Sequence, residues 1–353
     1  MASNRKVYVV TKRKKSRKKL AMFILTPILV LLFGTVGYVA TLYTKAEQVA
    51  DQSYEPLDRS SKAVADLSNH VDNMSILFIG VDDSQSRNYK DSTRSDALLL
   101  ATFNKKLKTV KLLSIPRDSY VYVPDKGDYT KINHAYALGG ARGSVETVEK
   151  LLDIPVDYYV RMNFYALIDI VDALGGIEVN VPYEMYEKDS KDRGKAIHLE
   201  KGVQVVNGEE ALAFTRTRKQ DNDMERGKRQ QEVIQAIVKK AATAQALTKY
   251  TDVMETVGEN MKTNFTFSQI KSLMAFALKN NDMEIENLQL QGQDATIDGV
   301  YYYQLDDENV EEISDTLKEH LETTASSKVA QETAPQETLK NQMPANSDSS
   351  EEE

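Results

Sequence analysis

One uncharged segment limits how this chain can fold more than any other feature of the sequence. Leu20 to Tyr43 contains no charged residue in 24 positions. As a helix this segment would be about 36 Å long, which is enough to cross the hydrocarbon core of a bilayer. It is longer than the apolar region of a signal peptide, which is typically about 7–15 residues, and no convincing small-x-small cleavage site follows it. We therefore expect a retained transmembrane helix over 20–43.

The charges beside this segment predict its orientation. Residues 1–19 carry nine Lys and Arg and no acidic residue, whereas the whole chain has a net charge of −8. The basic end should stay in the cytoplasm, which places everything after this single helix outside the cell membrane. The absence of cysteine is compatible with a location outside a Gram-positive cell. The remainder of the chain is strongly acidic. Nucleic-acid binding is therefore not expected, because it needs a basic face against the phosphates.

Composition divides the extracytoplasmic part into three regions. Residues 44–73 are polar with little apolar periodicity and are expected to form a stalk. Residues 74–323 carry the apolar runs of one folded domain. Residues 324–353 are rich in Ser, Thr, Gln, Pro and Glu and have hardly an aliphatic side chain. This acidic tail is predicted to be disordered, since it cannot bury enough surface to offset chain entropy.

Strand-like and helix-like patterns alternate along the domain. Three apolar runs with the character of buried strands come first, over 75–81, 97–103 and 109–115. The later strands are predicted over 157–160, 177–181 and 284–290, and the helices over 144–152, 164–174, 224–246, 267–278 and 308–322. This alternation predicts an α/β fold, with a single mixed sheet between layers of helices.

Four short stretches place charged residues where strands and loops meet, and Lys131 is a further candidate cation. They are Gly80-Val81-Asp82-Asp83, Arg94-Ser95-Asp96, Ser114-Ile115-Pro116-Arg117-Asp118, and Phe214-Thr215-Arg216-Thr217-Arg218 with the following Asp221, Asp223, Arg226 and Arg229. In an extended segment Arg216 and Arg218 would share a face, and on a helix Arg226 and Arg229 would share another.

The simplest interpretation of these residues is that they form ordinary surface salt bridges. The arginines point beyond it, because guanidinium groups packed together without an anion repel one another by several kcal/mol at an effective dielectric constant of about 20. Phosphate oxygens suit the planar fork of arginine. Aspartates beside them could hold Mg²⁺ against the same phosphates, since Mg²⁺ takes one or two carboxylates plus substrate oxygens. The combined pattern indicates a pyrophosphate site with a metal ion.

Other chemistries find no support in the sequence. The chain has no cysteine, which excludes disulfides, thiolate metal sites and a cysteine nucleophile. It has no P-loop and no Gly-x-Ser-x-Gly elbow. The four histidines, His70, His134, His198 and His320, are scattered and lack metal-ligand spacing.

The order of these motifs resembles the LytR-CpsA-Psr family of wall glycopolymer ligases. The resemblance spans about residues 75–246, where eight motifs follow one another. They are Ile79-Gly80-Val81-Asp82, Arg94-Ser95-Asp96, Leu113-Ser114-Ile115-Pro116-Arg117-Asp118, Lys131-Ile132-Asn133 with Ala135-Tyr136-Ala137-Leu138-Gly139-Gly140, Val171-Asp172-Ala173-Leu174-Gly175-Gly176, Asn207-Gly208-Glu209-Glu210-Ala211-Leu212-Ala213, Arg216-Thr217-Arg218, and Arg226-Gly227-Lys228-Arg229-Gln230-Gln231.

The resemblance implies a mixed α/β domain with an apolar tunnel for a polyprenyl chain. It implies that Asp82 and Asp96 hold Mg²⁺, with Mn²⁺ as an alternative, and that the pyrophosphate is bound by Arg117, Lys131, Arg216, Arg218, Arg226 and Arg229. The expected substrates are an undecaprenyl-pyrophosphate-linked glycopolymer, of the teichoic acid or capsule type, and peptidoglycan. The implied reaction is attack by the C6 hydroxyl of a muramic acid residue, which displaces undecaprenyl phosphate.

Within that reaction Arg117 and Arg218 are the expected catalytic cations. Asp118 either orients or deprotonates the acceptor, or fixes Arg117. Two other functions remain open at this point: a non-enzymatic regulator of the cell envelope, and a hydrolase that uses the same site with water as the acceptor.

Overall fold

The computed structural model describes residues 41, 43–45, 47–57, 73–82, 94–241, 258, 260–280 and 283–322. Within these residues no helix is both long and apolar enough to cross a membrane. The predicted span 20–43 lies outside them apart from positions 41 and 43, and so do the predicted cytoplasmic tail, most of the predicted stalk and the acidic tail.

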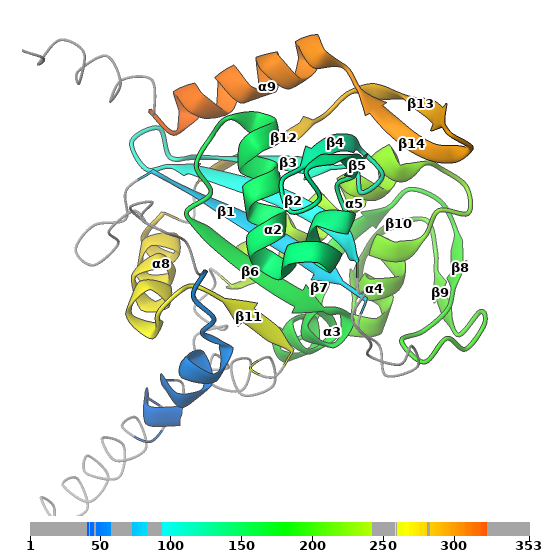
Figure 1. Ribbon diagram of the computed structural model, residues 1–353. Helices are drawn as coiled ribbons and strands as arrows, with labels where there is room; N and C mark the ends of the chain where they lie inside the picture. Colours follow the sequence, from blue (N-terminus) through cyan, green and yellow to red (C-terminus); the bar gives the residue numbers. More distant parts are fainter. Residues whose placement is uncertain are drawn as a thin grey trace, which may run out of the picture.

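A mixed six-stranded sheet organises the domain (Figure 1). Its strand order is β11-β6-β1-β2-β3-β12, with β1–β2, β2–β3 and β6–β11 antiparallel and β1–β6 and β3–β12 parallel. The strands are β1 Met74–Val81, β2 Ser95–Asn104, β3 Thr109–Ile115, β6 Tyr158–Asn163, β11 Met261–Thr263 and β12 Glu284–Gln289. The prediction of an α/β fold with one mixed sheet is therefore confirmed.

Helices cover both faces of this sheet. In the part of the chain that the structure describes they include α2 His134–Leu152, α3 Phe164–Ala173, α4 Gly208–Arg216, α5 Asp223–Ala241, α8 Phe267–Lys279 and α9 Asp307–His320. Alternate residues of β1 point to opposite layers: Leu77 and Ile79 pack in the core shared with α2 and α9, whereas Phe78 packs toward α5 and α8. Because the central strands are buried on both faces, their sequences are nearly continuous apolar runs.

Four two-stranded hairpins or ladders surround the main sheet. They are β4 Tyr120–Val123 with β5 Asp128–Lys131, β7 Ile177–Val181 with β10 Gly202–Val206, β8 Met185–Glu187 with β9 Ile197–Leu199, and β13 Gly292–Ile297 with β14 Val300–Leu305. A second core under α3, α4 and α5 is built on β7 and β10 and includes the buried Val179 and Phe214.

Two helical predictions differ from the structure. Helix α2 begins at His134 rather than at 144, because its first turns are built from Ala and Gly and show no apolar stripe. Gly140 breaks its geometry with φ 61°. Helix α4 was not among the predicted helices. It begins with a capping box: the Asn207 side chain accepts from the Glu210 N–H at 3.0 Å, and the Glu210 carboxylate accepts from the Asn207 N–H at 2.8 Å.

Part of the predicted stalk lies on the surface of the domain. Ala50 is buried. The Ser53 hydroxyl donates to the Gly258 carbonyl at 3.0 Å, and the Tyr159 hydroxyl donates to the Glu55 carbonyl at 2.8 Å. Residues 47–57 therefore hold the chain against the β11 edge of the sheet instead of separating the domain from the preceding segment.

The end of α9 is fixed by a buried histidine. His320 is 3% exposed, and its two ring nitrogens lie 2.8 Å from the hydroxyls of Thr102 and Thr109, on β2 and β3. Burial lowers the pKa of His320 from 6.5 to about 4, with the nearby Lys111 acting in the same direction. The folded protein therefore holds this ring neutral through the range in which an unfolded chain would protonate it.

We predict that stability falls as the pH is lowered through this range. The pKa of His320 is lower in the folded protein than in the unfolded chain, so its neutral ring contributes fully to the free energy of unfolding above pH 6.5. This contribution, about 2–3 kcal/mol, is lost as the pH falls toward 4. Urea unfolding of the full chain at pH 7 and pH 5 measures the change. His320→Gln should show a smaller pH dependence than the unaltered protein; an equal dependence would contradict the assignment.

Candidate active site

The two predicted metal ligands meet at one end of the β1–β2 pair. Gly80 pairs with Ala97 and Val81 pairs with Ser95, so Asp96 is the extra residue of a β-bulge. Asp82 follows directly after β1, at the same end of the pair. The bulge therefore brings two carboxylates from separate strands to one edge, although no group of three or more His, Cys, Asp or Glu with metal-binding geometry occurs among the described residues.

The end of β3 adds cations to this edge. Arg117, two residues after the strand, forms an ion pair with Asp96 and lies 3.5 Å from the Asp118 carboxylate through its Nε. Lys131, the last residue of β5, donates from Nζ to the other Asp118 oxygen at 2.7 Å. Asp118 thus holds two of the predicted phosphate ligands side by side.

The corner between α4 and α5 supplies the remaining arginines. Arg226 is 7% exposed and donates to the Asp96 carbonyl at 2.7 Å, while Arg218 Nε lies 3.3 Å from Asp223. Glycine at position 227 lets helix α5 approach this closely, because a Cβ there would lie only 2.5 Å from the Ser114 hydroxyl and would force that side chain to move. The arginines of α4 and α5 and the bulge of β2 therefore form a single cluster.

Arg216 and Arg218 would share a face if their segment were extended, but it is not extended in the structure. Arg216 is the last residue of α4, and its guanidinium lies over the Phe164 ring, 4.7 Å from the ring centroid. Thr217 is the C-cap, so Arg218 leaves the helix in another direction and reaches Asp223. The two residues consequently line different cavities.

Arg229 has a different environment from the other arginines. It shares a helix face with Arg226, as predicted, but is 4% exposed and lines neither cavity described below. Its guanidinium donates to the carbonyls of Phe214 at 2.9 Å and Thr217 at 2.6 Å, and forms an ion pair with Asp221. These carbonyls end helix α4, so Arg229 joins α5 to the end of α4.

Positive groups lie close together in this cluster. Burial, together with the positive charges of Arg218 and Arg117, lowers the pKa of Arg226 to about 10, while Asp96 and Asp223 act in the opposite direction. Arg117 Nε is buried without a hydrogen-bond partner, although it lies 3.5 Å from an Asp118 oxygen. Converging cations with unused hydrogen-bonding capacity are typical of a site built for an anion.

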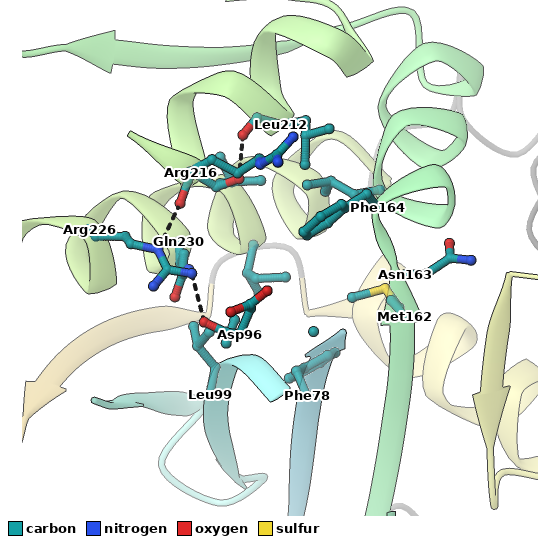
Figure 2. A pocket seen from close by; sticks show the side chains of 16 residues that line it. Phe78, Asp96, Leu99, Met162, Asn163, Phe164, Leu212, Arg216, Arg226 and Gln230 are labelled. Carbon is teal, nitrogen blue, oxygen red and sulfur yellow. Dashed lines mark hydrogen bonds between the residues drawn. The ribbon is translucent and has the colours of Figure 1, made fainter. Parts of the chain in front are cut away.

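An apolar cavity of about 90 Å³ lies on one side of this cluster (Figure 2). Its walls come from the α5 face of the sheet and from α3, α4 and α5, and Figure 2 shows the Asp96, Arg216 and Arg226 side chains at its polar end with Phe78, Leu99 and Met162 around the apolar part. The other lining residues are Gly80, Ala97, Asn163, Phe164, Leu167, Leu212, Thr215, Gln230, Val233 and Ile234.

A second, more polar cavity of about 610 Å³ lies on the other side. Arg117, Lys131 and Arg218 line it together with Asp118 and Asp223. The remaining lining residues are Pro116, Asp221, Asn222, Met224, Asp294, Tyr301 and Tyr303. Arg117 faces this cavity while its ion-pair partner Asp96 faces the apolar one, so the charged cluster is the wall between the two.

The sequence motifs identified most of the charged residues of this cluster but not its tyrosines. Asp294, Tyr301 and Tyr303 come from the β13–β14 hairpin, more than 70 residues beyond Arg218, and no charge pattern marks them. The Tyr303 N–H donates to the Asp118 carbonyl at 2.9 Å, which attaches the hairpin to the site. Asp83, the second carboxylate of the first sequence stretch, lies outside the described residues.

Comparison with known proteins gives consistent results. The family model described as the LytR_cpsA_psr family matches residues 40–319. The polyisoprenyl-teichoic acid–peptidoglycan teichoic acid transferase TagU of Bacillus subtilis is 40% identical over 313 residues, which are 88% of this chain and 98% of that protein.

Two solved structures are also similar. One is TagT bound to LI-WTA, with 38% identity, a TM-score of 0.64, and coverage of 76% of this chain and 100% of that one. The other is the LytR-CPS2A-psr family protein YwtF (TagT) with bound octaprenyl pyrophosphate lipid, with 36% identity, a TM-score of 0.61 and the same coverage. This chain belongs to the LytR-CpsA-Psr family.

Proposed function

We propose that the protein is a phosphotransferase that moves a glycopolymer from a polyprenyl pyrophosphate carrier onto peptidoglycan. One observation carries the proposal: the charged cluster separates an apolar cavity from an open polar one, with Asp96 lining the first and Arg117 the second. A lipid pyrophosphate has the same order of parts, with an apolar chain, then two phosphates, then a sugar. The names of the relatives agree with this substrate class and with a peptidoglycan acceptor.

The prenyl chain would enter the apolar cavity and continue beyond it. A long prenyl chain needs more room than about 90 Å³, but Phe78 at the cavity wall packs in the same cluster as Phe103. Phe103 in turn lines a groove of about 580 Å³ between α5, α8 and the sheet, together with Leu273 and Phe276. The side chain of Phe78 therefore stands between two apolar spaces that the chain could join.

The residues of the cluster then have separate roles in the transfer. The acceptor hydroxyl oxygen forms a bond to the distal phosphorus, and the bond from that phosphorus to the bridging oxygen breaks, so that polyprenyl phosphate leaves. Arg117, Arg218 and Arg226 stabilise the charge that builds up on the phosphate oxygens. Lys131 adds a fourth cation, and Asp118 holds Lys131 and Arg117 in place. Because Asp118 also lines the polar cavity, it can orient the acceptor hydroxyl or take its proton.

Asp82 and Asp96 fit a magnesium ion chemically. Both offer hard carboxylate oxygens at one edge of the sheet, and two protein carboxylates plus substrate oxygens are what Mg²⁺ usually takes in phosphoryl-transfer sites. When bound, the ion, or Mn²⁺ in its place, would neutralise charge on the phosphates. The ion pair with Arg117 fixes the position of the Asp96 carboxylate at this edge of the sheet.

The two other predicted phosphate ligands differ from this group. Arg216 lies at the polar end of the apolar cavity, where it can reach the phosphate next to the lipid. Arg229 donates its hydrogen bonds to carbonyls at the C-terminal end of α4 and to Asp221. We therefore assign it to positioning the corner between α4 and α5, which carries Arg216 and Arg218.

The same function sets the location of the protein. Peptidoglycan lies outside the cell membrane, so the domain is extracytoplasmic and the basic residues 1–19 are cytoplasmic. The uncharged segment 20–43 is then the single membrane anchor.

Replacing the cations of the polar cavity tests the transferase reaction. Arg117→Ala and Arg218→Ala should keep normal unfolding transitions but lose transfer by about 100-fold or more, because each removes charge stabilisation from the transition state. The assay follows lipid-linked polymer and its products with the full chain in membranes, with and without peptidoglycan. Arg193→Ala is the control, since Arg193 is ion-paired with Asp189 outside both cavities and should keep full activity. Retained transfer in both site variants would refute the assignment. Polymer release at equal rates without peptidoglycan would indicate a hydrolase.

Metal dependence is tested separately. Chelation should abolish transfer, and added Mg²⁺ should restore it, with Mn²⁺ as the second ion to try. Asp82→Asn and Asp96→Asn should each raise the Mg²⁺ concentration needed for half-maximal rate. Calorimetric titration of Mg²⁺ in the presence of inorganic pyrophosphate gives a readout apart from activity. An unchanged Mg²⁺ requirement in both variants would exclude these two carboxylates as ligands.

Replacing Arg229 should lower the stability of the fold much more than replacing Arg218. Arg229→Ala leaves two helix-end carbonyls without their donor and leaves the buried Asp221 carboxylate with the Tyr183 hydroxyl but no cation, and we expect a loss of about 3–5 kcal/mol in unfolding free energy. Arg218→Ala should change the unfolding free energy by less than about 1 kcal/mol, because Arg218 is partly exposed and forms a single ion pair. Denaturant unfolding of the two variants compares them directly; equal losses would contradict the division of roles.

A further inference from the structure

A group of tyrosines extends from the polar cavity across two hairpins. This tyrosine platform consists of Tyr120, Tyr122, Tyr129, Tyr301 and Tyr302, from β4–β5 and β13–β14. The ring centroids of Tyr302 and Tyr120 are 4.8 Å apart, those of Tyr120 and Tyr129 are 5.5 Å apart, and those of Tyr129 and Tyr122 are 5.7 Å apart. These four rings therefore form one continuous series of contacts, and Tyr301 is linked to it through Lys131, which lies over the rings of both Tyr301 and Tyr302.

Strand register places this series on one face and starts it at the reaction site. Tyr120 is paired with Lys131 across β4–β5, and Tyr122 is paired with Tyr129. Val121 and Val123 are buried, so the alternate residues of β4 face outward. Lys131 itself lies 5.4 Å from the Tyr301 ring centroid and 5.6 Å from that of Tyr302. The platform thus begins at a cation of the polar cavity and leads away from it.

The second hairpin is held rigidly against the site. Backbone pairing joins Ser119 to Tyr303, and the Tyr301 hydroxyl donates to the Asp294 carboxylate at 2.8 Å. That hydrogen bond and burial raise the pKa of Tyr301, so its phenol stays protonated and neutral. A platform attached to the backbone of Asp118–Ser119 keeps a fixed position relative to the reacting atoms.

Packing of the core does not account for these rings. Tyr122, Tyr129 and Tyr301 are 37%, 52% and 43% exposed. Half-exposed tyrosines combine a flat apolar face with a polar edge, and such side chains are enriched where proteins bind partners. The C–H faces of pyranose rings stack on such aromatic surfaces, while the phenol hydroxyls can bond sugar hydroxyls and acetamido groups.

The charges on the platform distinguish between two glycans. The two hairpins carry four aspartates and two lysines. Lys131 is paired with Asp118, Lys126 with Asp128, and Asp125 with Arg142, so the net negative charge of the surface comes from Asp294 and Asp298 on the second hairpin. An acidic surface repels a polymer with repeated phosphodiesters, such as an anionic donor glycan, but accepts a neutral glycan backbone. In-line displacement also requires the acceptor to approach opposite the leaving lipid phosphate, and so from the side away from the apolar cavity.

We propose that the tyrosine platform binds the glycan backbone of the peptidoglycan acceptor and directs its hydroxyl to the polar cavity. This assignment rests on the proposed transferase function and adds the surface that recognises the acceptor. Sugars at a distance from the reacting hydroxyl lie over Tyr129 and Tyr122, whereas the reacting residue lies between Lys131 and Tyr301.

Kinetics of the full chain in membranes test the proposal. Tyr122→Ala with Tyr129→Ala should raise the KM for a soluble peptidoglycan oligosaccharide by about tenfold or more, with the KM for the lipid-linked donor unchanged, because truncated aromatic contacts typically cost more than about 1 kcal/mol. Tyr129→Trp keeps a stacking surface and should preserve the acceptor KM. Tyr54→Ala is the matched control: it is 41% exposed but lies at the β11 edge of the sheet.

The kinetic outcomes separate the platform from the transferase reaction itself. If the unaltered protein performs no acceptor-dependent transfer, the proposed function fails and the platform assignment fails with it. If the unaltered protein transfers normally and the double variant keeps the acceptor KM, only the platform is refuted. A raised donor KM in the double variant would assign the tyrosines to the donor polymer and would equally overturn the proposal.

Direct binding provides a readout that does not need catalysis. The β-1,4-linked tetramer of N-acetylglucosamine is the probe, with binding followed by calorimetry on the full chain in detergent. The unaltered protein and Tyr54→Ala should bind it, and the double variant should lose at least about tenfold in affinity. An oligomer of glycerol phosphate should not compete. Equal binding of the tetramer by all three proteins, or competition by glycerol phosphate at the tyrosines, would contradict acceptor recognition.

Discussion

The interaction on which the site depends is the contact of Asp96 with two arginines. Its carboxylate pairs with Arg117, which follows strand β3. Its backbone carbonyl accepts a hydrogen bond from Arg226, which lies in helix α5. The β-bulge makes this possible, because it turns one residue of a buried ladder out of register toward the helices. The positive charges of Arg218 and Arg117 act on Arg226 in the same direction as burial and lower its pKa, so a further anion would relieve the repulsion among these three guanidinium groups.

This arrangement also explains why the two cavities remain separate. The apolar cavity is bounded on the side of the cluster by Asp96, Arg226 and the end of α4. The polar cavity is bounded there by Arg117, Asp118 and Lys131, which are joined by ion pairs. A lipid in the first space would be shielded from water by α3, α4 and α5, whereas the second space stays open to large polar molecules. The lipid and the acceptor polymer would thus reach the charged cluster from opposite sides.

Much of the fold and of the charged cluster could be predicted from the sequence, for local physical reasons. The central strands are apolar runs because both faces are covered, and Arg117 and Asp118 follow the end of a strand directly. Helix α4 could have been found from its Asn207-x-x-Glu210 capping box, and the β13–β14 turn from Asp298-Gly299, whose φ values of 49° and 77° fit the turn that such a pair favours. The interpretation of Arg229 could not be settled, because spacing along a helix does not show which carbonyls a guanidinium will reach.

The tyrosines of the platform show the limit of sequence reasoning most clearly. Tyr302 lies 182 positions from Tyr120, and only the pairing of Ser119 with Tyr303 brings them together. Aromatic residues in strands are ordinarily interpreted as packing, and alternation alone could place either face of a short hairpin outward. What makes the outward face informative is its combination with Lys131 on the same face and with a surplus of aspartates around it. This surface has a phosphate site at one end and is acidic along the rest of its length. A polyanionic glycan would be repelled along most of the surface, whereas a neutral glycan could lie along it and place its hydroxyl next to the phosphate.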